Sequence, residues 1–405
     1  MIATTPFHDR LSRLNTQGLY THWSGHLSAL RYTSAPKHEY FAVRNAVGVF
    51  DTSPLFKYRV TGPDAERFLA GVLVRDIRLC RPGRAQYTLW CDDRGFVMED
   101  GVVFRESEND FLVTSARPAL GWFADLTGRL RVRIEDVSDD YGVLAVQGPR
   151  SRTVLAALTT DVESLAYFEH TQTKIGGAPV LLSRTGYTGD LGFELTVEAG
   201  HAVDVLDAVL EAGAGHSLRP FGEEALMMLR IEAGLPLVDV EWHDSRLAFT
   251  DHDRVTPSEL GMGWMLRGVD DDTRPFLGRT AIRRELADHT SRWSSVGIVV
   301  DWEHWARLHR DAGLLPPKDE HAPAYESMLY DAPAGSERSQ VGYTTSQMFS
   351  PVLQRHIGLA RVRPDLAAAG TEVHLEITVN HHNTTVPART AKLPLYNPAR
   401  KTARP

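Results

Sequence analysis

The order of apolar and polar residues along the chain follows two different spacings. Apolar side chains at every second position predict strands, and turn residues join these strands in pairs. We therefore expect two β-hairpins, residues 86–91 with 96–104 and residues 179–183 with 192–197. Apolar positions spaced by three and four residues predict helices over 202–211 and 222–233, the second ending at Gly234.

From residue 293 onward the pattern changes to short strands separated by turn signals. We expect strands at 296–300, 340–345, 357–362, 372–379 and 385–393. Such a series is typical of a closed β module. The polar, proline-containing stretch 313–336 is too long for a tight connection and predicts an excursion on the surface. The expected fold class is α+β, followed by a β-barrel or jelly-roll-like domain.

Composition and charge exclude several classes of protein. The 405 residues are 42% hydrophobic and 24% charged, which suits two or three globular domains. Two cysteines exclude a disulfide framework, and a net charge of -8 argues against a nucleic-acid partner. No stretch approaches the roughly 18 apolar residues of a membrane span, and the N-terminus lacks the apolar core of a signal peptide. We expect a cytoplasmic protein with no membrane partner.

The most informative residue is a carboxylate in an apolar strand. Because strand side chains alternate, Asp100 shares one face with Phe96, Met98, Val102 and Phe104. It is either a hydrogen-bonded or solvated residue at a bulge or edge, or a carboxylate desolvated beside a ligand, as catalytic groups often are. The sequence leaves open whether Tyr87 or Thr88 lies across from it, because a bulge at Gly95 would shift the register by one residue.

Two further charged residues stand out from their neighbours. Glu194 follows a glycine-rich turn, on the strand face opposite Phe193 and Leu195. It is either an ordinary solvent-facing residue or a partner for an amidine-like edge such as a pterin ring. Arg230 lies in an apolar helical segment, where it either pairs with a buried carboxylate or binds an anionic ligand. The 17 histidines show no close metal-binding pattern, so no metal is expected.

Short motifs follow one another in a fixed order along nearly the whole chain. They are VGVFDTS at 47–53, VTGPDA at 60–65, AVQGP at 145–149, RTGYTG at 184–189, GFE at 192–194, LRIEAGLP at 229–236, TPSELG at 256–261, VGYTTS at 341–346 and SP at 350–351. Each motif alone is weak, but the ordered set is specific. Together with the hairpin from Tyr87 to Asp100, it resembles the tetrahydrofolate-dependent aminomethyltransferase (glycine-cleavage T-protein) superfamily.

The resemblance implies a three-lobed fold around a central folate site, with a C-terminal β-barrel. We expect residues 1–285 to form a two-lobed α+β folate-binding region and residues 286–405 to form the barrel domain. The cofactor implied is tetrahydrofolate. The site residues implied are a catalytic aspartate, Asp100, and four cofactor-binding residues: Tyr87, Glu194, Arg230 and Tyr187.

The sequence differs from glycine-cleavage T-proteins beside the catalytic position. Gly101 follows Asp100 where those proteins usually carry leucine, and this pattern looks more like the folate-dependent demethylase branch. Tyr20, close to Trp23, is the candidate substrate-binding residue. The segment 300–340 contains four aromatic residues that could cover an apolar donor: Trp302, Trp305, Tyr325 and Tyr330.

The expected activity is therefore transfer of a methyl group from a small O-, N- or S-methyl compound to N5 of tetrahydrofolate. Asp100 would orient the folate amine and stabilise the positive charge that develops at N5. One alternative is aminomethyl transfer in glycine cleavage, with a lipoyl carrier protein as partner. The other is a folate-binding protein without catalytic activity.

Overall fold

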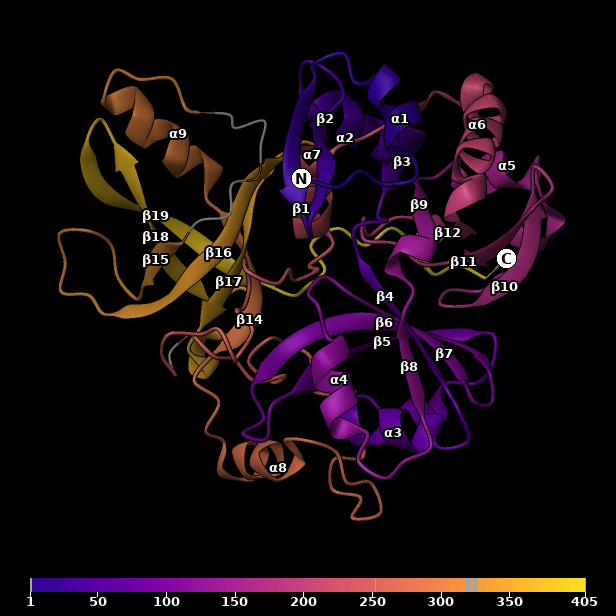
Figure 1. Ribbon diagram of the computed structural model, residues 1–405. Coiled ribbons are helices and arrows are strands. Elements are labelled where there is room, and N and C mark those ends of the chain that lie inside the picture. Colours follow the sequence, from indigo (N-terminus) through magenta and orange to yellow (C-terminus); the bar gives the residue numbers. More distant parts are fainter. Residues whose placement is uncertain (1, 252, 318–321, 323–325, 405) are drawn as a thin grey trace.

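Three lobes surround the centre of the molecule in the computed structural model (Figure 1). The structure describes residues 2–251, 253–317, 322 and 326–404. One lobe is built on a six-stranded sheet, one on a five-stranded sheet, and the third is a closed six-stranded barrel. The expected α+β class with a C-terminal barrel is confirmed. Among the described residues, no helix is long and apolar enough to cross a membrane.

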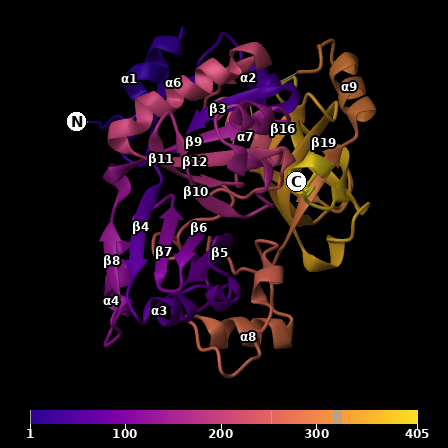
Figure 2. The same ribbon diagram turned by 90° about the vertical axis from the view of Figure 1, so that its right-hand side faces the viewer.

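The six-stranded lobe has the strand order β10-β11-β12-β9-β3-β13. Its strands are β3 (Val47–Asp51), β9 (Tyr141–Gln147), β10 (His170–Ile175), β11 (Ala178–Ser183), β12 (Gly192–Glu198) and β13 (Leu218–Pro220). Its helices are α1 (His8–Leu11), α2 (Pro36–Asn45), α5 (Ser151–Ala156), α6 (Ala202–Gly213) and α7 (Glu223–Glu232). Phe193 and Leu195 of β12 pack against Val205 and Val209 of α6, which lies over the sheet in Figure 2. Alternation along β12 therefore leaves Glu194 on the other face, as expected.

The five-stranded lobe has the strand order β5-β6-β7-β4-β8. Its strands are β4 (Phe56–Thr61), β5 (Arg84–Cys91), β6 (Val97–Ser107), β7 (Asp110–Ser115) and β8 (Arg133–Asp136). Helices α3 (Ala65–Val72) and α4 (Leu120–Leu126) cover one face, where Phe68 and Phe123 pack around the buried Trp90. Burial of these aromatic rings holds the long β5–β6 hairpin in place.

A bulge in β6 sets the register of that hairpin. Leu89 lies opposite Asp100, and Tyr87 lies opposite Val102. Neither register expected from the sequence is present, because two shifts add together: Cys91 pairs with Val97 in place of Phe96, and the extra residue Met98 in β6 moves the pairing by one more residue. Consequently Met98 joins the cluster around Trp90, on the sheet face away from Asp100, and the expected single row of five residues is wrong.

The barrel closes in the order β14-β17-β16-β15-β18-β19. Its strands are β14 (Ser294–Val300), β15 (Ser327–Tyr330), β16 (Gln340–Ser350), β17 (Arg355–Val362), β18 (Glu372–Val379) and β19 (His382–Ala391). All five strands expected from the sequence are present. The expected excursion 313–336 instead contains β15, and helix α9 (Trp302–Asp311) precedes it. Helix α8 (Arg279–Asp288) lies in the connection before the barrel.

Two segments link the lobes. The hairpin of β1 (Leu19–Trp23) and β2 (His26–Arg31) reaches the five-stranded lobe through its tip, where Ser24 Oγ donates to the carbonyl of Ala116 at 2.8 Å. After β19 the chain leaves the barrel and returns to the six-stranded lobe, where Arg400 Nε lies 2.6 Å from Asp190 Oδ1. Further along, the carbonyl of Ala403 accepts from Arg184, which directly follows β11, at 2.8 Å. The division at residues 285 and 286 stays a prediction; all six barrel strands lie beyond it.

Candidate active site

A cavity of about 1550 Å³, here called the central cavity, is lined by side chains from all three lobes. The five-stranded lobe contributes Tyr87 and Asp100, the six-stranded lobe contributes Glu194, and the barrel contributes Ser295 and Ala391. Its volume exceeds that of a typical drug-sized pocket, which is about 300–1,000 Å³. It can therefore hold an extended ligand together with a second, smaller one.

Asp100 and Tyr87 form a hydrogen-bonded pair in the cavity wall. The Tyr87 hydroxyl donates to Asp100 Oδ2 at 2.6 Å. The two residues are diagonal neighbours across β5 and β6, a separation that a tyrosine side chain can span. Burial raises the pKa of the Asp100 carboxyl, while the hydrogen bond from Tyr87 acts in the opposite direction. Burial, with the charge of Asp100, also raises the pKa of Tyr87 well above its ordinary value.

Glu99 is a second carboxyl at this position, and the sequence analysis missed it. Its side chain is 1% exposed and accepts two backbone N–H groups, from Asp100 and from Arg117, each at 2.9 Å. Burial, then the charge of Asp100, raises the pKa of Glu99 well above its ordinary value. Glu99 thus fixes the backbone on both sides of the site. The bulge that turns it inward could not be located from the sequence pattern.

Gly101 is required by close packing of the backbone. A Cβ atom added there would lie 1.9 Å from the carbonyl oxygen of Thr114 in β7. The absent side chain therefore gives no extra room beside Asp100, because the neighbouring strand occupies that space. Glycine in place of the usual leucine therefore opens no space for a free methyl donor.

Glu194 lines the central cavity from β12. Its Oε2 accepts a hydrogen bond from the hydroxyl of Thr185, which in turn lies 2.7 Å from Ser183 Oγ. Burial raises the pKa of the Glu194 carboxyl, and the hydrogen bond from Thr185 lowers it in part. A carboxylate has acceptor capacity beyond one hydrogen bond, so Glu194 can also accept from a ligand.

Tyr187 is anchored to the segment that follows α7. Its hydroxyl donates to the carbonyl of Pro236 at 2.5 Å, and the residue lines the central cavity. Burial raises the pKa of Tyr187 well above its ordinary value, although the charge of Arg230 acts to lower it. The phenol therefore stays neutral and offers its ring to a ligand.

Arg230 has the first of its two expected arrangements, pairing with a buried carboxylate. Its guanidinium is fully buried, 2.8 Å from Glu241 Oε2 and 2.7 Å from Ser346 Oγ of the barrel. Glu241 also accepts the backbone N–H of Leu237 at 2.8 Å. Within the described chain, Arg230 is not among the residues lining the central cavity. Its predicted folate contact stays a prediction.

Comparisons with known proteins agree with this architecture. The GCVT N-terminal domain matches residues 7–268, and the glycine cleavage T-protein C-terminal barrel domain matches residues 312–397. The chain belongs to the glycine cleavage T-protein family. It is 33% identical to an aminomethyltransferase of Saccharopolyspora erythraea over 97% of both chains. It is 35% identical to one of Geobacillus kaustophilus over 85% of this chain and 86% of the other.

Other relatives of this T-protein family member differ in length and name. A trimethylamine-oxide aldolase of Ruegeria pomeroyi is 33% identical over 98% of this chain but only 47% of its own. The crystal structure of glycine cleavage system aminomethyltransferase T from Bartonella henselae superimposes with a TM-score of 0.80 at 20% identity, covering 98% of this chain and 99% of the other. That likeness establishes the fold. The predicted superfamily and its one-carbon transferase activity are thus confirmed.

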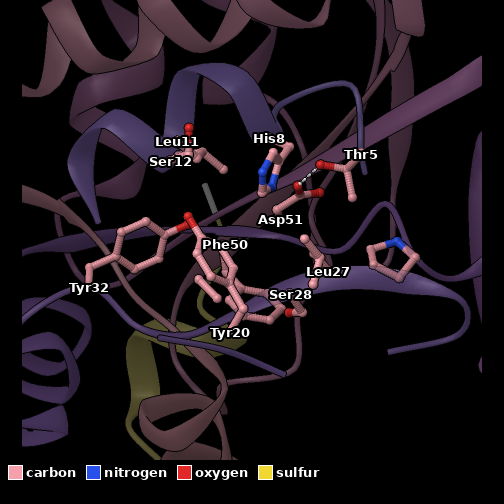
Figure 3. Close-up of a pocket in the computed structure, with 12 residues that line it drawn as sticks. Thr5, His8, Leu11, Ser12, Tyr20, Leu27, Ser28, Tyr32, Phe50 and Asp51 are labelled. Atoms are coloured by element: carbon pink, nitrogen blue, oxygen red, sulfur yellow. Dashed lines mark hydrogen bonds between the residues drawn. The ribbon is translucent and has the colours of Figure 1, made fainter. Parts of the chain in front are cut away.

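Tyr20 lies apart from the other predicted site residues of this T-protein family member. It lines a separate small cavity of about 20 Å³ beside His8, Tyr32 and Asp51 (Figure 3). That volume accommodates about one water molecule. In the described chain, Tyr20 does not line the central cavity, whereas its neighbour Trp23 does. Substrate binding by Tyr20 stays a prediction.

The aromatic residues expected to cover the donor pack elsewhere. Trp302 and Trp305 of α9 stack on His356 of the barrel, with ring centroids 4.9 and 4.5 Å apart. Tyr330 donates to Glu376 at 3.1 Å. None of these described residues lines the central cavity, and Tyr325 lies outside the described residues. The aromatic rings there belong to the barrel surface, so they offer no support for an apolar lid.

Proposed function

We propose that the protein transfers an aminomethyl-derived one-carbon unit to tetrahydrofolate, the alternative that its aminomethyltransferase relatives favour over methyl transfer. The observation that carries this proposal is the buried Tyr87–Asp100 pair, in the cavity wall of a chain that matches those enzymes end to end. Two of the cited relatives are named aminomethyltransferase and trimethylamine-oxide aldolase. Both names refer to a compound in which the carbon is bonded to nitrogen.

The central cavity suits tetrahydrofolate in size and in the chemistry of its lining. Glu194 offers a desolvated carboxylate for the amidine-like edge of the pterin. Tyr187 presents a neutral ring close by. Arg84, Lys392 and Lys401 also line the cavity and can attract the glutamate carboxylates. Tetrahydrofolate, when bound, supplies the N5 amine that accepts the one-carbon unit.

Asp100 is the residue that we assign to the reacting atoms. The hydrogen bond from Tyr87 fixes one carboxylate oxygen, and the two backbone contacts of Glu99 hold the strand beneath it. A negative charge held in a desolvated wall stabilises developing positive charge more strongly than one in water, and it needs no reorganisation during the reaction. Its raised pKa also brings Asp100 closer to the range useful for accepting a proton.

Methyl transfer has weaker support because two of its three motivating features do not hold. Gly101 makes no space beside Asp100, and none of the described aromatic residues of segment 300–340 lines the cavity. Trp23, the neighbour of the candidate Tyr20, does line the cavity. We therefore place methyl transfer second.

Analysis of the folate product by mass spectrometry tests the proposal. The full chain is incubated with tetrahydrofolate and either an aminomethylated lipoyl carrier protein or a panel of methylated amines, ethers and sulfonium compounds. We expect methylenetetrahydrofolate. Formation of 5-methyltetrahydrofolate from a methylated donor would replace the proposal with a demethylase. Tight folate binding without any product would indicate a non-catalytic folate-binding protein.

A further inference from the structure

The carboxylates that line the central cavity differ in whether they have partners. Asp100 accepts from Tyr87, Glu194 accepts from Thr185, and Asp239 pairs with Arg117. Glu223, the first residue of α7, differs from them, because its hydrogen bond from Ser28 leaves one buried oxygen unpaired among the described residues. Its Oε1 is buried and has no hydrogen-bond partner among the described residues. A buried carboxylate oxygen without a partner is costly, so it requires an explanation.

Among the described residues, Glu223 also lacks a cationic partner. The neighbouring Glu224 forms an ion pair with Arg31 at 3.6 Å. Within the described chain, no Arg, Lys or His forms an ion pair with Glu223. Burial raises the pKa of the Glu223 carboxyl, with a hydrogen bond from Ser28 acting in the opposite direction. A cationic ligand would remove most of this desolvation cost, because it supplies the missing opposite charge.

The surroundings of Glu223 suit a cation that carries carbon groups. Leu226 and Met227 lie one turn further along α7, line the same cavity, and pack in one cluster with Trp23. Strand pairing puts Trp23 on the hairpin face that carries Ser28, since Thr21 pairs with Ser28 and Trp23 follows two residues later. An indole ring, two apolar side chains and one carboxylate form a site for an alkylated ammonium group.

We propose that Glu223 and Trp23 bind the positively charged nitrogen of the one-carbon donor, so that this enzyme selects a protonated or quaternary amine over a neutral compound. This assignment rests on the proposed one-carbon transfer, because it specifies the charge of the donor. The hairpin that carries Trp23 touches Ala116, next to the Arg117 N–H that binds Glu99. The cation site and the Asp100 site are therefore joined through one loop of the cavity wall.

The test uses small probes and separates donor binding from turnover. Binding of trimethylammonium and of the neutral tert-butanol to the full chain is measured by ligand-observed NMR, with tetrahydrofolate binding measured by calorimetry. Glu223→Gln should weaken trimethylammonium binding by about tenfold or more, which corresponds to about 1.4 kcal/mol, and leave folate affinity unchanged. Trp23→Leu should act in the same direction.

Glu224→Gln is the matched control, since it removes a charge from the same helical turn but not from the cavity lining. It should leave trimethylammonium binding unchanged. Equal binding by wild type and Glu223→Gln, or equal binding of tert-butanol and trimethylammonium, would overturn the assignment. Unchanged folate affinity in each variant verifies folding. Cation binding at Glu223 in a protein that turns over no donor would uphold the assignment and reject the proposed reaction instead.

Discussion

Replacing Arg230 by methionine distinguishes a structural ion pair from a folate-binding residue. The change removes two charge-assisted hydrogen bonds, at 2.8 Å to Glu241 and 2.7 Å to Ser346, worth about 3–6 kcal/mol together. It also removes Arg230 Nε, a buried donor that has no partner among the described residues, and this returns about 1–3 kcal/mol. The expected net loss is about 3 kcal/mol in the free energy of unfolding.

Urea denaturation of a double-mutant cycle with Glu241→Gln measures this loss directly. In Glu241→Gln the amide oxygen can accept from the Leu237 N–H, and the amide N–H can donate to the Thr345 hydroxyl, so this neutral variant should fold. Through coupling, the double variant should regain more than about 1 kcal/mol in the free energy of unfolding. If Arg230→Met lowers folate affinity by disturbing the cavity wall at Pro236, the double variant should restore that affinity as well. A stable Arg230→Met protein whose folate affinity falls and is not rescued by Glu241→Gln would refute the structural role.

Three further predictions concern the site itself. Asp100→Asn should keep the thermal midpoint near wild type but lower turnover on the order of 10²-fold, and a normal rate in single-turnover assays would exclude Asp100 from catalysis. Glu194→Gln should weaken folate binding by roughly 1–3 kcal/mol in calorimetry through loss of a charge-assisted pair, whereas unchanged affinity would reject the pterin contact. Gly101→Ala should cost more than about 2 kcal/mol by thermal unfolding, because its Cβ meets the Thr114 carbonyl oxygen at 1.9 Å. Gly121→Ala, with nothing within 4 Å, is its control and should be neutral or slightly stabilising.

Periodicity was sufficient to locate the elements whose apolar faces pack on a single neighbour. The strands of both hairpins, helices α6 and α7, and five barrel strands follow directly from it. Helix α9 was missed although Trp302, Trp305, Ala306 and His309 have helical spacing and Asp301 caps its N-terminus, accepting from His304 N–H at 2.9 Å. The four-residue β15 has no readable pattern, because it is fixed by strands on both sides.

Contacts between segments that are distant in the sequence determine two features that the sequence left open, the register of the β5–β6 hairpin and the partner of Arg230. The bulge at Met98 accompanies a hydrogen bond from Val97 N–H to the carbonyl of Val255 at 2.8 Å, a pairing that no local pattern encodes. The partner of Arg230 comes from Glu241 and from the barrel, so the helix alone could not identify it. Sequence motifs thus found the carboxylates Asp100 and Glu194 but missed Glu99 and Glu223, whose significance depends on what surrounds them.

The barrel completes the active-site wall as well as forming a separate core. Glu232 of α7 accepts from Tyr40 and from Ser350 of the barrel, each at 2.5 Å, and pairs with the buried Arg44. Arg361 of the barrel donates to the carbonyl of Glu241. Glu241 lies in the segment after α7 that also contains Pro236, whose carbonyl accepts from the Tyr187 hydroxyl. Because α7 also begins with Glu223, one helix joins the barrel contacts to the proposed cation site. Displacing the barrel would therefore disturb both the proposed folate-binding wall and the proposed donor-binding wall of the central cavity. This coupling gives a physical reason why a domain that contributes neither Asp100 nor Glu194 takes part in the same candidate site.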